Sequence, residues 1–342
     1  MSNMTEISSL GEFGLIRHLT ENIKSVNKST VKGVGDDAAV LQYAEKQTLV
    51  TTDLLLEGIH FDLTYTPLKH LGYKSAVVNF SDIYAMNGQP KQITVSIGIS
   101  KRFSVEDLEA FYDGLRLACE IYGVDIVGGD TSASMTGLCI SITCIGEGEK
   151  GKITYRSGAK NTDLICVSGD LGAAYMGLQL LEREKKVFQG EKDFQPDFEG
   201  REYLLERQLK PEARRDIIKS LNDNDILPTS MIDISDGLSS ELLHICTESR
   251  VGCRIYEDRI PIDYQTAAMA EQFNMNLTTA ALNGGEDYEL LFTAPLSLHK
   301  KLENLDGIKI IGYVCNQDDG ACLLARDGTE IPLVAQGWDA IK

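Results

Sequence analysis

The sequence predicts two domains of mixed α/β (α+β) architecture. Short runs rich in β-branched residues are intermixed along the chain with segments whose apolar residues recur at helical spacing. A length of 342 residues is enough for two domains that each bury a core. The glycine-rich charged turn at 146–152 is the predicted boundary, so we expect domains at 1–150 and 151–342.

The elements of the N-terminal domain follow from local patterns. We expect a short amphipathic helix over 12–21 and strands over 49–53, 92–99, 125–127 and 138–145. A longer helix is expected over 68–87, where Gly88 ends the apolar pattern. Another is expected over 104–121, because Glu106 and Asp107 favour its first turn.

The C-terminal domain shows the same mixture. The patterns predict strands over 164–168, 231–234, 290–293 and 309–314, and helices over 173–185 and 237–247. The segment 184–211 is highly charged and poor in apolar residues. We expect it to be an exposed helical hairpin or a mobile insertion that touches no motif.

The charge balance excludes several classes of partner. Lysine and arginine total 33 and aspartate and glutamate 51, a formal net charge of −18. Nucleic acids and anionic membranes both require a basic footprint, so neither is an expected partner. A nucleotide remains compatible, because divalent metals can bridge two anions.

The location is expected to be cytoplasmic. No uncharged run reaches membrane-spanning length, and residues 1–11 lack the apolar core of a signal peptide. The eight cysteines include no C-x-x-C pair, and several lie in apolar stretches. They are predicted to be buried free thiols in a reducing compartment.

Acidic clusters are the most informative feature of the chain. Five of them stand beside apolar stretches or glycine-bracketed turns: GDDA at 35–38, TTD at 51–53, NFSD at 79–82, GGDT at 128–131 and DISDG at 233–237. If they converge, two carboxylates about 4 Å apart repel by roughly 4 kcal/mol at an effective dielectric near 20. Such a site needs divalent cations, and hard oxygen ligands suit Mg²⁺ together with substrate phosphates. The clusters therefore predict a Mg-dependent nucleotide enzyme.

Each cluster also has a purely structural interpretation. Asp53 and Asp130 are expected at or just beyond strand ends, the edge where α/β sheets bind ligands. Asp82 alone is more typical of a solvated or capping carboxylate. Ser235 or Asp236 could cap the following helix, which is worth about 1 kcal/mol.

Four residues outside the clusters are candidates for ligand contacts. Glu286, in a glycine-gated acidic loop, could bind a polar ligand group or belong to an ordinary hairpin. Arg156 could supply a planar cation to a phosphate or lie on the surface. His60 could be structural. Trp338, the sole tryptophan, could anchor a core or stack on an aromatic ligand.

Over nearly its whole length the chain resembles the thiamine-monophosphate kinases of the aminoimidazole ribonucleotide synthetase superfamily. The resemblance rests on GEFGLI at 11–16, GVGDDAAV at 33–40, TTDLLLEGIHF at 51–61, VNFSDIYAMNGQP at 78–90, IVGGDT at 126–131, TYRSGAK at 154–160, IDISDGLSSELLHI at 232–245 and NGGEDYELLF at 283–292. It implies ATP as co-substrate, several Mg²⁺ ions and thiamine monophosphate as phosphoryl acceptor. It also implies a homodimer formed through the N-terminal domain.

The resemblance assigns roles to individual positions. The implied metal ligands are Asp37, Thr51, Thr52, Asp53, Asp82, Asp130, Asp233 and Asp236. The implied ATP contacts are Tyr112, Gly129, Asp130, Arg156 and Ser235. The implied contacts with thiamine monophosphate are His60, Glu286 and Trp338. No residue is expected to be catalytic in the strict sense, because the acceptor is already an ionised phosphate and needs no general base.

Other functions are distinguished by specific features. A selenophosphate synthetase should carry a reactive cysteine or selenocysteine in a glycine-rich N-terminal segment, whereas the first cysteine here is Cys119. A carbamoyl dehydratase of hydrogenase maturation should end in a reactive cysteine, whereas this chain ends in Lys342. An aminoimidazole ribonucleotide synthetase-like enzyme stays open as the alternative. A non-catalytic divalent-ion binder is disfavoured, because the clusters lack the ligand loop of an EF-hand.

Overall fold

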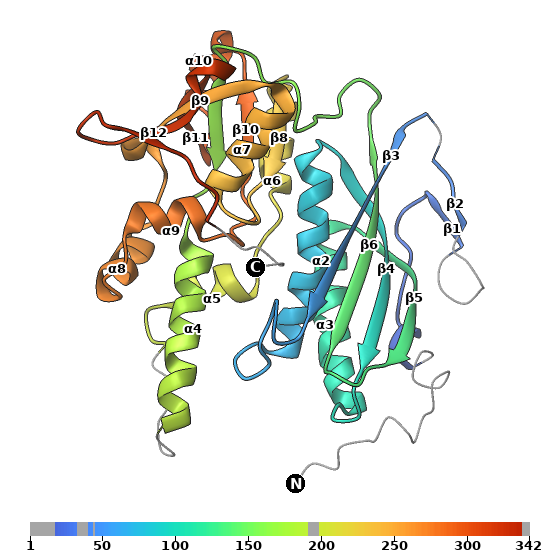
Figure 1. Ribbon diagram of the computed structural model, residues 1–342. Helices are drawn as coiled ribbons and strands as arrows, with labels where there is room; N and C mark the ends of the chain where they lie inside the picture. Colours follow the sequence, from blue (N-terminus) through green and yellow to red (C-terminus); the bar gives the residue numbers. More distant parts are fainter. Residues whose placement is uncertain (1–17, 33–39, 44, 191–197, 337–342) are drawn as a thin grey trace. The chain divides into compact units, whose positions relative to one another are not determined.

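The computed structural model describes residues 18–32, 40–43, 45–190 and 198–336 (Figure 1). The chain divides into two compact units: unit 1 comprises 1–83 and 88–151, and unit 2 comprises 84–87 and 152–342. Both units mix helices with β-sheet, which confirms the predicted fold class. The expected helix over 12–21 lies largely outside the described residues.

Unit 1 is built on a four-stranded sheet with the order β3-β6-β4-β5. Its strands are β3 (Gln47–Leu56), β4 (Gln89–Ile99), β5 (Asp125–Ala133) and β6 (Cys139–Gly148). All neighbours are antiparallel except β4 and β5. A separate two-stranded sheet pairs β1 (Thr30–Lys32) with β2 (Val40–Leu41).

Two helices, α2 (Leu68–Ala85) and α3 (Val105–Tyr122), cover one face of this sheet (Figure 1). They pack backbone against backbone, since a Cβ added at Gly72 would lie 1.9 Å from the Phe111 carbonyl oxygen. The start of α3 is fixed by a capping box between Ser104 and Asp107. Its end is fixed by Gly123, which adopts a left-handed φ of 71°.

Unit 2 contains a seven-stranded sheet with the order β13-β12-β9-β11-β7-β10-β8. Its strands are β7 (Leu164–Ser168), β8 (Ser230–Asp233), β9 (Val251–Tyr256), β10 (Leu290–Ala294), β11 (Ile308–Asn316), β12 (Ala321–Leu324) and β13 (Glu330–Pro332). Only β12 and β9 run parallel. Every residue of β7 and β10 is buried, so both faces of the sheet are covered at its centre.

The described helices of unit 2 form two apolar cores. They are α4 (Ala173–Gly190), α5 (Glu202–Leu209), α6 (Arg215–Asp223), α7 (Leu238–Ser249), α8 (Tyr264–Gln272), α9 (Leu277–Asn283) and α10 (His299–Glu303). One core joins α7 to the sheet, and the other joins α4, α5, α8 and α9.

The prediction for the charged segment 184–211 is wrong in two respects. It is helical as expected in its described parts, since α4 extends to Gly190 and α5 packs against it. However, Leu204 is buried in the second core, and Arg207 and Gln208 lie against the 283–292 motif. The segment therefore touches a motif after all. Arg207 is paired with Glu289 inside the unit, an arrangement that hydrophobic periodicity does not reveal.

The cysteines agree with the expectation from composition. All eight cysteines are free thiols, and six of them are buried. In the part of the chain that the structure describes, no helix has the length and apolar character needed to cross a membrane.

Candidate active site

In unit 1 the structure brings Thr51, Asp53 and Asp82 together. Side chains alternate along β3, so Thr51 and Asp53 share the helix-covered face with the buried Leu49 and Leu55. Thr51 Oγ1 donates a 2.5 Å hydrogen bond to Oδ2 of Asp82, which lies on α2. Asp82 lies inside α2 and is therefore not a capping carboxylate.

The Asp53 carboxylate lies in an unfavourable environment. Its Oδ2 atom is buried and has no hydrogen-bond partner among the described residues. Burial, reinforced by the negative charge of Asp82, raises the pKa of Asp53 to about 6. Two carboxylates beside a hydroxyl are a donor set that suits a hard divalent cation, whose charge would remove this penalty.

The larger predicted convergence of carboxylates involves residues of both units and stays a prediction. In the part of the chain that the structure describes, no three His, Cys, Asp or Glu side chains are grouped so as to hold a metal ion. Asp37 and Trp338 both lie outside the described residues. Asp53, Asp82 and Asp130 belong to unit 1, whereas Asp233 and Asp236 belong to unit 2.

The expectation that Asp53 and Asp130 stand at strand ends is wrong. Strand β3 continues to Leu56 and β5 to Ala133, so both aspartates lie inside strands. The pairing register places Asp53 in a row with Ile142, Val95 and Gly129. Asp130 pairs with Ser96, in the next row, and therefore projects from the opposite face.

Thr52 and Gly129 also have local structural roles. Thr52 projects from the face opposite to Thr51, and its hydroxyl donates to the Ile142 carbonyl at 3.1 Å. Its backbone carbonyl, not this hydroxyl, remains the candidate ligand. A Cβ at Gly129 would lie 2.0 Å from the Val95 carbonyl oxygen, so the close approach of β4 requires glycine there.

His60 and Tyr112 are held firmly by their surroundings. The Leu56 amide donates to Nδ1 of His60 at 3.0 Å, which fixes the ring beside the end of β3. Tyr112 is buried on α3, and this burial raises its pKa to about 12. The nucleotide contact implied for Tyr112 stays a prediction.

In unit 2 the loop 233–237, with its predicted metal and ATP residues, is joined to the loop that carries Glu286. Three backbone hydrogen bonds of 2.7 to 2.9 Å connect them: Ile234 N–H to Glu289, Glu286 N–H to Ser235, and Tyr288 N–H to Ile234. A Cβ at Gly285 would lie 2.7 Å from the Ser235 carbonyl oxygen. Ser235, predicted to contact ATP, and Glu286, predicted to contact thiamine monophosphate, thus lie on loops that are hydrogen-bonded to each other.

The electrostatics of Asp236 confirm that these side chains are neighbours. Burial raises the pKa of Asp236, and Glu286 adds to this, whereas His244 and Arg156 lower it. Arg156, Asp236 and Glu286 are therefore close enough to influence one another. A cation and two carboxylates at this loop pair can bind a phosphate through Arg156 and a metal through Asp236.

The capping alternative for Ser235 and Asp236 is wrong. The residue before α7 is Gly237, and no side chain caps the helix. Glu241, one turn into α7, instead accepts from the backbone N–H groups of Ser235 at 3.2 Å and Asp236 at 2.9 Å. Burial raises the pKa of Glu241 to about 7, although these N–H groups lower it.

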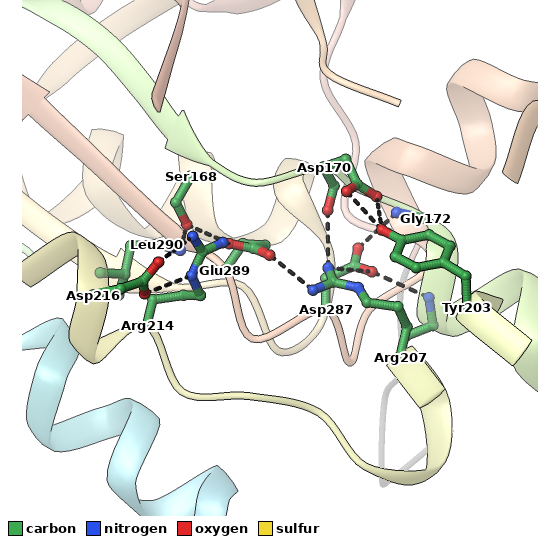
Figure 2. A network of polar contacts seen from close by, with 11 residues as sticks. Ser168, Asp170, Gly172, Tyr203, Arg207, Arg214, Asp216, Asp287, Glu289 and Leu290 are labelled. Atoms are coloured by element: carbon green, nitrogen blue, oxygen red, sulfur yellow. Dashed lines mark hydrogen bonds and ion pairs between the residues drawn. The ribbon is translucent and has the colours of Figure 1, made fainter. Parts of the chain in front are cut away.

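Sequence reasoning missed Glu241 and the residues behind the Glu286 loop. Figure 2 shows a buried polar network there, in which Arg207 and Arg214 face Glu289 and Asp287. The position of Glu241, four residues after a helix-starting glycine, could have indicated its role. No local signal could have linked Arg207 to residues about 80 positions further along the chain.

Comparison with known proteins identifies the family. Residues 35–147 match the model of the AIR synthase related protein, N-terminal domain. The chain is 37% identical to the thiamine-monophosphate kinase of Aquifex aeolicus (strain VF5), covering 84% of this chain and 87% of the relative. The chain belongs to the thiamine-monophosphate kinase family. It is also 32% identical to the thiamine-monophosphate kinase of Bacillus subtilis (strain 168), over 97% of this chain and 100% of that one.

Solved structures of the family share the fold. AaThiL complexed with AMPPCP and TMP matches with a TM-score of 0.75 and 33% identity, over 99% of this chain and 100% of its own. A thiamine-monophosphate kinase from Stenotrophomonas maltophilia K279a matches with a TM-score of 0.76 and 31% identity, over 92% and 95%. The hydrogenase maturation protein HypE, at 17% identity and a TM-score of 0.73 over 95% and 97%, shares the fold alone.

Proposed function

We propose that the protein transfers the γ-phosphoryl group of ATP to thiamine monophosphate, forming thiamine diphosphate. Family membership supports this reaction, and so does the AaThiL structure, which holds AMPPCP and TMP. The observation that carries the proposal is the pairing of the 233–237 loop with the Glu286 loop through three backbone hydrogen bonds. It joins the loop of Ser235, a proposed nucleotide contact, to the loop of Glu286, a proposed acceptor contact, and this supports direct transfer between bound substrates.

The proposed domain roles follow the two units. Residues 1–150 bind ATP and Mg²⁺ and form the dimer, and residues 151–342 complete the nucleotide and substrate site. The proposed metal ligands remain Asp37, Thr51, Thr52, Asp53, Asp82, Asp130, Asp233 and Asp236. Of these, Asp53, Asp82 and Thr51 fit a cation best, because their oxygens converge and Asp53 Oδ2 is buried without a hydrogen-bond partner among the described residues.

In the proposed mechanism the protein positions reactants and balances charge. Bound Mg²⁺ would supply neutralisation of the triphosphate and of the charge that develops during transfer. Arg156 and Ser235 would hold the nucleotide, with Gly129 and Tyr112 as further proposed contacts. Glu286, His60 and Trp338 would orient thiamine monophosphate, whose ionised phosphate is itself the nucleophile. No general base and no phosphoenzyme are needed.

A homodimer is proposed through the uncovered face of the unit 1 sheet. Opposite the helices, β3 exposes Val50 by 66% and Leu54 by 53%. Large apolar side chains exposed on one face of a sheet are typical of an interface. We also propose a cytoplasmic location, because eight free thiols suit a reducing compartment.

The deciding experiment is incubation with ATP, thiamine monophosphate and Mg²⁺, with thiamine diphosphate followed by chromatography. We expect product that depends on both the metal and the acceptor. ATP hydrolysis without thiamine diphosphate would favour the alternative, another ATP-dependent superfamily member such as an aminoimidazole ribonucleotide synthetase-like enzyme. With γ-labelled ATP and no acceptor, we expect no labelled protein; a phosphoprotein that chases into product would refute direct transfer.

A further inference from the structure

Helix α5, in the charged segment, contacts the loop that carries the proposed substrate ligand Glu286. Gln208 is buried on this helix, and its Nε2 donates a 2.7 Å hydrogen bond to Oε2 of Glu286. Both residues lie in unit 2, so the contact is internal to one compact body. Because the amide donates to one particular oxygen, it restricts rotation of the carboxylate.

The backbone of the Glu286 loop is strained in a way that requires support. Glu286 and Tyr288 have φ values of 58° and 51°, in the left-handed region that side chains disfavour. Such residues cost on the order of 1 kcal/mol each and persist only where their surroundings hold them. The three hydrogen bonds to residues 234 and 235 hold one side of the loop.

Two buried arginines hold the other side of the loop. Arg207, next to Gln208, donates to Glu289 Oε1 at 2.8 Å and to the Asp170 carbonyl at 3.0 Å. Arg214 donates to Glu289 Oε2, and Ser168 donates to the same oxygen. Asp287 lies 3.7 Å from Arg207 and accepts from the Gly172 amide at 2.7 Å (Figure 2).

Two buried carboxylates of the network face two arginines. Asp287 and Glu289 are each 1% exposed, and the two arginines that face them are 14% and 15% exposed. A buried ion set of this kind contributes little net stability compared with apolar packing, but it fixes geometry. The network lies directly behind Glu286, which indicates that it fixes the conformation of the Glu286 loop.

We propose that Gln208 positions the Glu286 carboxylate for binding thiamine monophosphate, which makes helix α5 part of the substrate site; this rests on the proposed function. Gln208 is a positioning residue, since it acts through Glu286. The aminopyrimidine of the substrate carries an amino donor, and a carboxylate held in one rotamer accepts from it without an ordering cost on binding. Loss of the Gln208 donor should therefore weaken the binding of thiamine monophosphate and leave the binding of ATP unchanged.

The test compares three variants with the wild-type protein. Gln208→Met keeps the length of the side chain and removes the donor. Gln208→Glu keeps the shape and places a second carboxylate beside Glu286. Leu204→Val, one turn earlier on α5, perturbs the apolar core and is the matched control for general loss of packing.

We expect Gln208→Met to raise KM for thiamine monophosphate about tenfold, with KM for ATP unchanged, since hydrogen bonds to charged groups are worth about that factor. Gln208→Glu should raise it further. Calorimetric Kd values for thiamine monophosphate without ATP should follow the same order. Leu204→Val should lower Tm and leave both KM values unchanged.

The outcomes separate the inference from the proposed function. A wild-type protein that neither binds nor phosphorylates thiamine monophosphate would overturn the proposed function and the inference with it. An active wild type whose Gln208 variants keep the wild-type KM would overturn the inference alone. If Gln208→Met fails to fold, as seen by circular dichroism, Gln208→Glu carries the comparison, because it preserves the volume and shape of the side chain.

Discussion

The Thr51 hydroxyl on strand β3 donates a 2.5 Å hydrogen bond to the Asp82 carboxylate on helix α2. Thr51 lies two residues before the half-buried Asp53 on the same strand. The bond holds Asp82 beside a second carboxylate, although the pair repels. A protein that needed only stability would avoid this arrangement. The relationship supports the cation site that we propose between the strand and the helix.

Thr51→Val should lower activity far more than Thr52→Val does. Valine has nearly the shape of threonine, so each variant removes one hydroxyl and leaves the strand intact. Only the Thr51 hydroxyl contacts Asp82, whereas that of Thr52 donates to a backbone carbonyl on the other face. We expect the Mg²⁺ concentration for half-maximal rate to rise about tenfold in Thr51→Val and less than threefold in Thr52→Val. Equal shifts in a Mg²⁺ titration would contradict the assignment of faces.

Asp53→Asn should abolish activity and stabilise the metal-free protein. The pKa of Asp53 rises from 3.8 to about 6 on folding, so its ionised form destabilises the folded state by on the order of 2 kcal/mol above pH 6. Asparagine cannot ionise. We expect Tm of the variant to exceed that of wild type by about 5 °C at pH 8 in EDTA.

The pH dependence of this gain has a definite sign. When folding raises the pKa of an acid, the folded protein becomes less stable as the pH increases from the pKa of the unfolded state to the pKa of the folded state. The difference between variant and wild type should therefore shrink from pH 6 downward and vanish near pH 4. Thermal unfolding at several pH values measures it. A gain that is independent of pH would rule out ionisation of Asp53 as the cause.

Glu241→Leu should weaken ATP binding, whereas Glu241→Gln should preserve it. The Glu241 carboxylate accepts the N–H groups of Ser235 and Asp236 through Oε1, and a glutamine can keep the same acceptor. Leucine leaves two buried donors unsatisfied. We expect KM for ATP to rise about tenfold in Glu241→Leu and to stay within about threefold of wild type in Glu241→Gln. Similar increases in KM for ATP in both variants would show that the negative charge of Glu241 matters and that its role as a hydrogen-bond acceptor does not.

Arg207→Met should destabilise the protein by about 3–5 kcal/mol in urea unfolding, because it removes one of the two cations that balance the buried Asp287 and Glu289. Lys219→Met is the matched control. Lys219 pairs with Asp223 on the surface, where its side chain is 74% exposed, so its removal should cost less than about 1 kcal/mol. Comparable losses in the two variants would mean that the buried network contributes no more than a surface pair.

Leu54→Lys should convert the proposed homodimer into monomers. The side chain projects from the uncovered face of the unit 1 sheet, and a lysine on both copies would introduce repelling charges into the interface. Light scattering after size-exclusion chromatography gives the mass. Lys150→Leu, in the turn after β6, is a control that leaves this face unchanged. A variant that stays dimeric would place the interface elsewhere.

Much of the secondary structure could be predicted because its causes are local. The capping box at Ser104 and the apolar periodicity of 68–87 lie within a few residues of the elements they specify. The predicted strands are too short, since β3 continues past Asp53 to Leu56 and β5 continues past Val127 through the polar residues Gly128–Asp130 to Ala133. Polar residues inside a strand that lies on one edge of a sheet look like loop residues when only sequence is considered.

The motifs also identified most candidate ligands, because carboxylates and glycines at close spacing are a local signal. That signal could not say which members of a motif share a face. The sequence does not distinguish Thr51 from Thr52, whereas the pairing of β3 with β6 shows that their side chains project from opposite faces of the sheet. Nor could it identify Glu241 or Gln208, whose roles depend on a partner loop.

The sequence by itself determined the fold class and the family, and it predicted the requirement for metal, since residue type and spacing encode those directly. The tertiary structure alone decided that Thr51, Asp53 and Asp82 lie together and that the 233–237 and 283–289 loops are hydrogen-bonded. It also decided that the charged helix α5 supports Glu286. The physical reason is that side-chain direction and pairing across 31 to 78 residues of chain are set by packing, which no local pattern records.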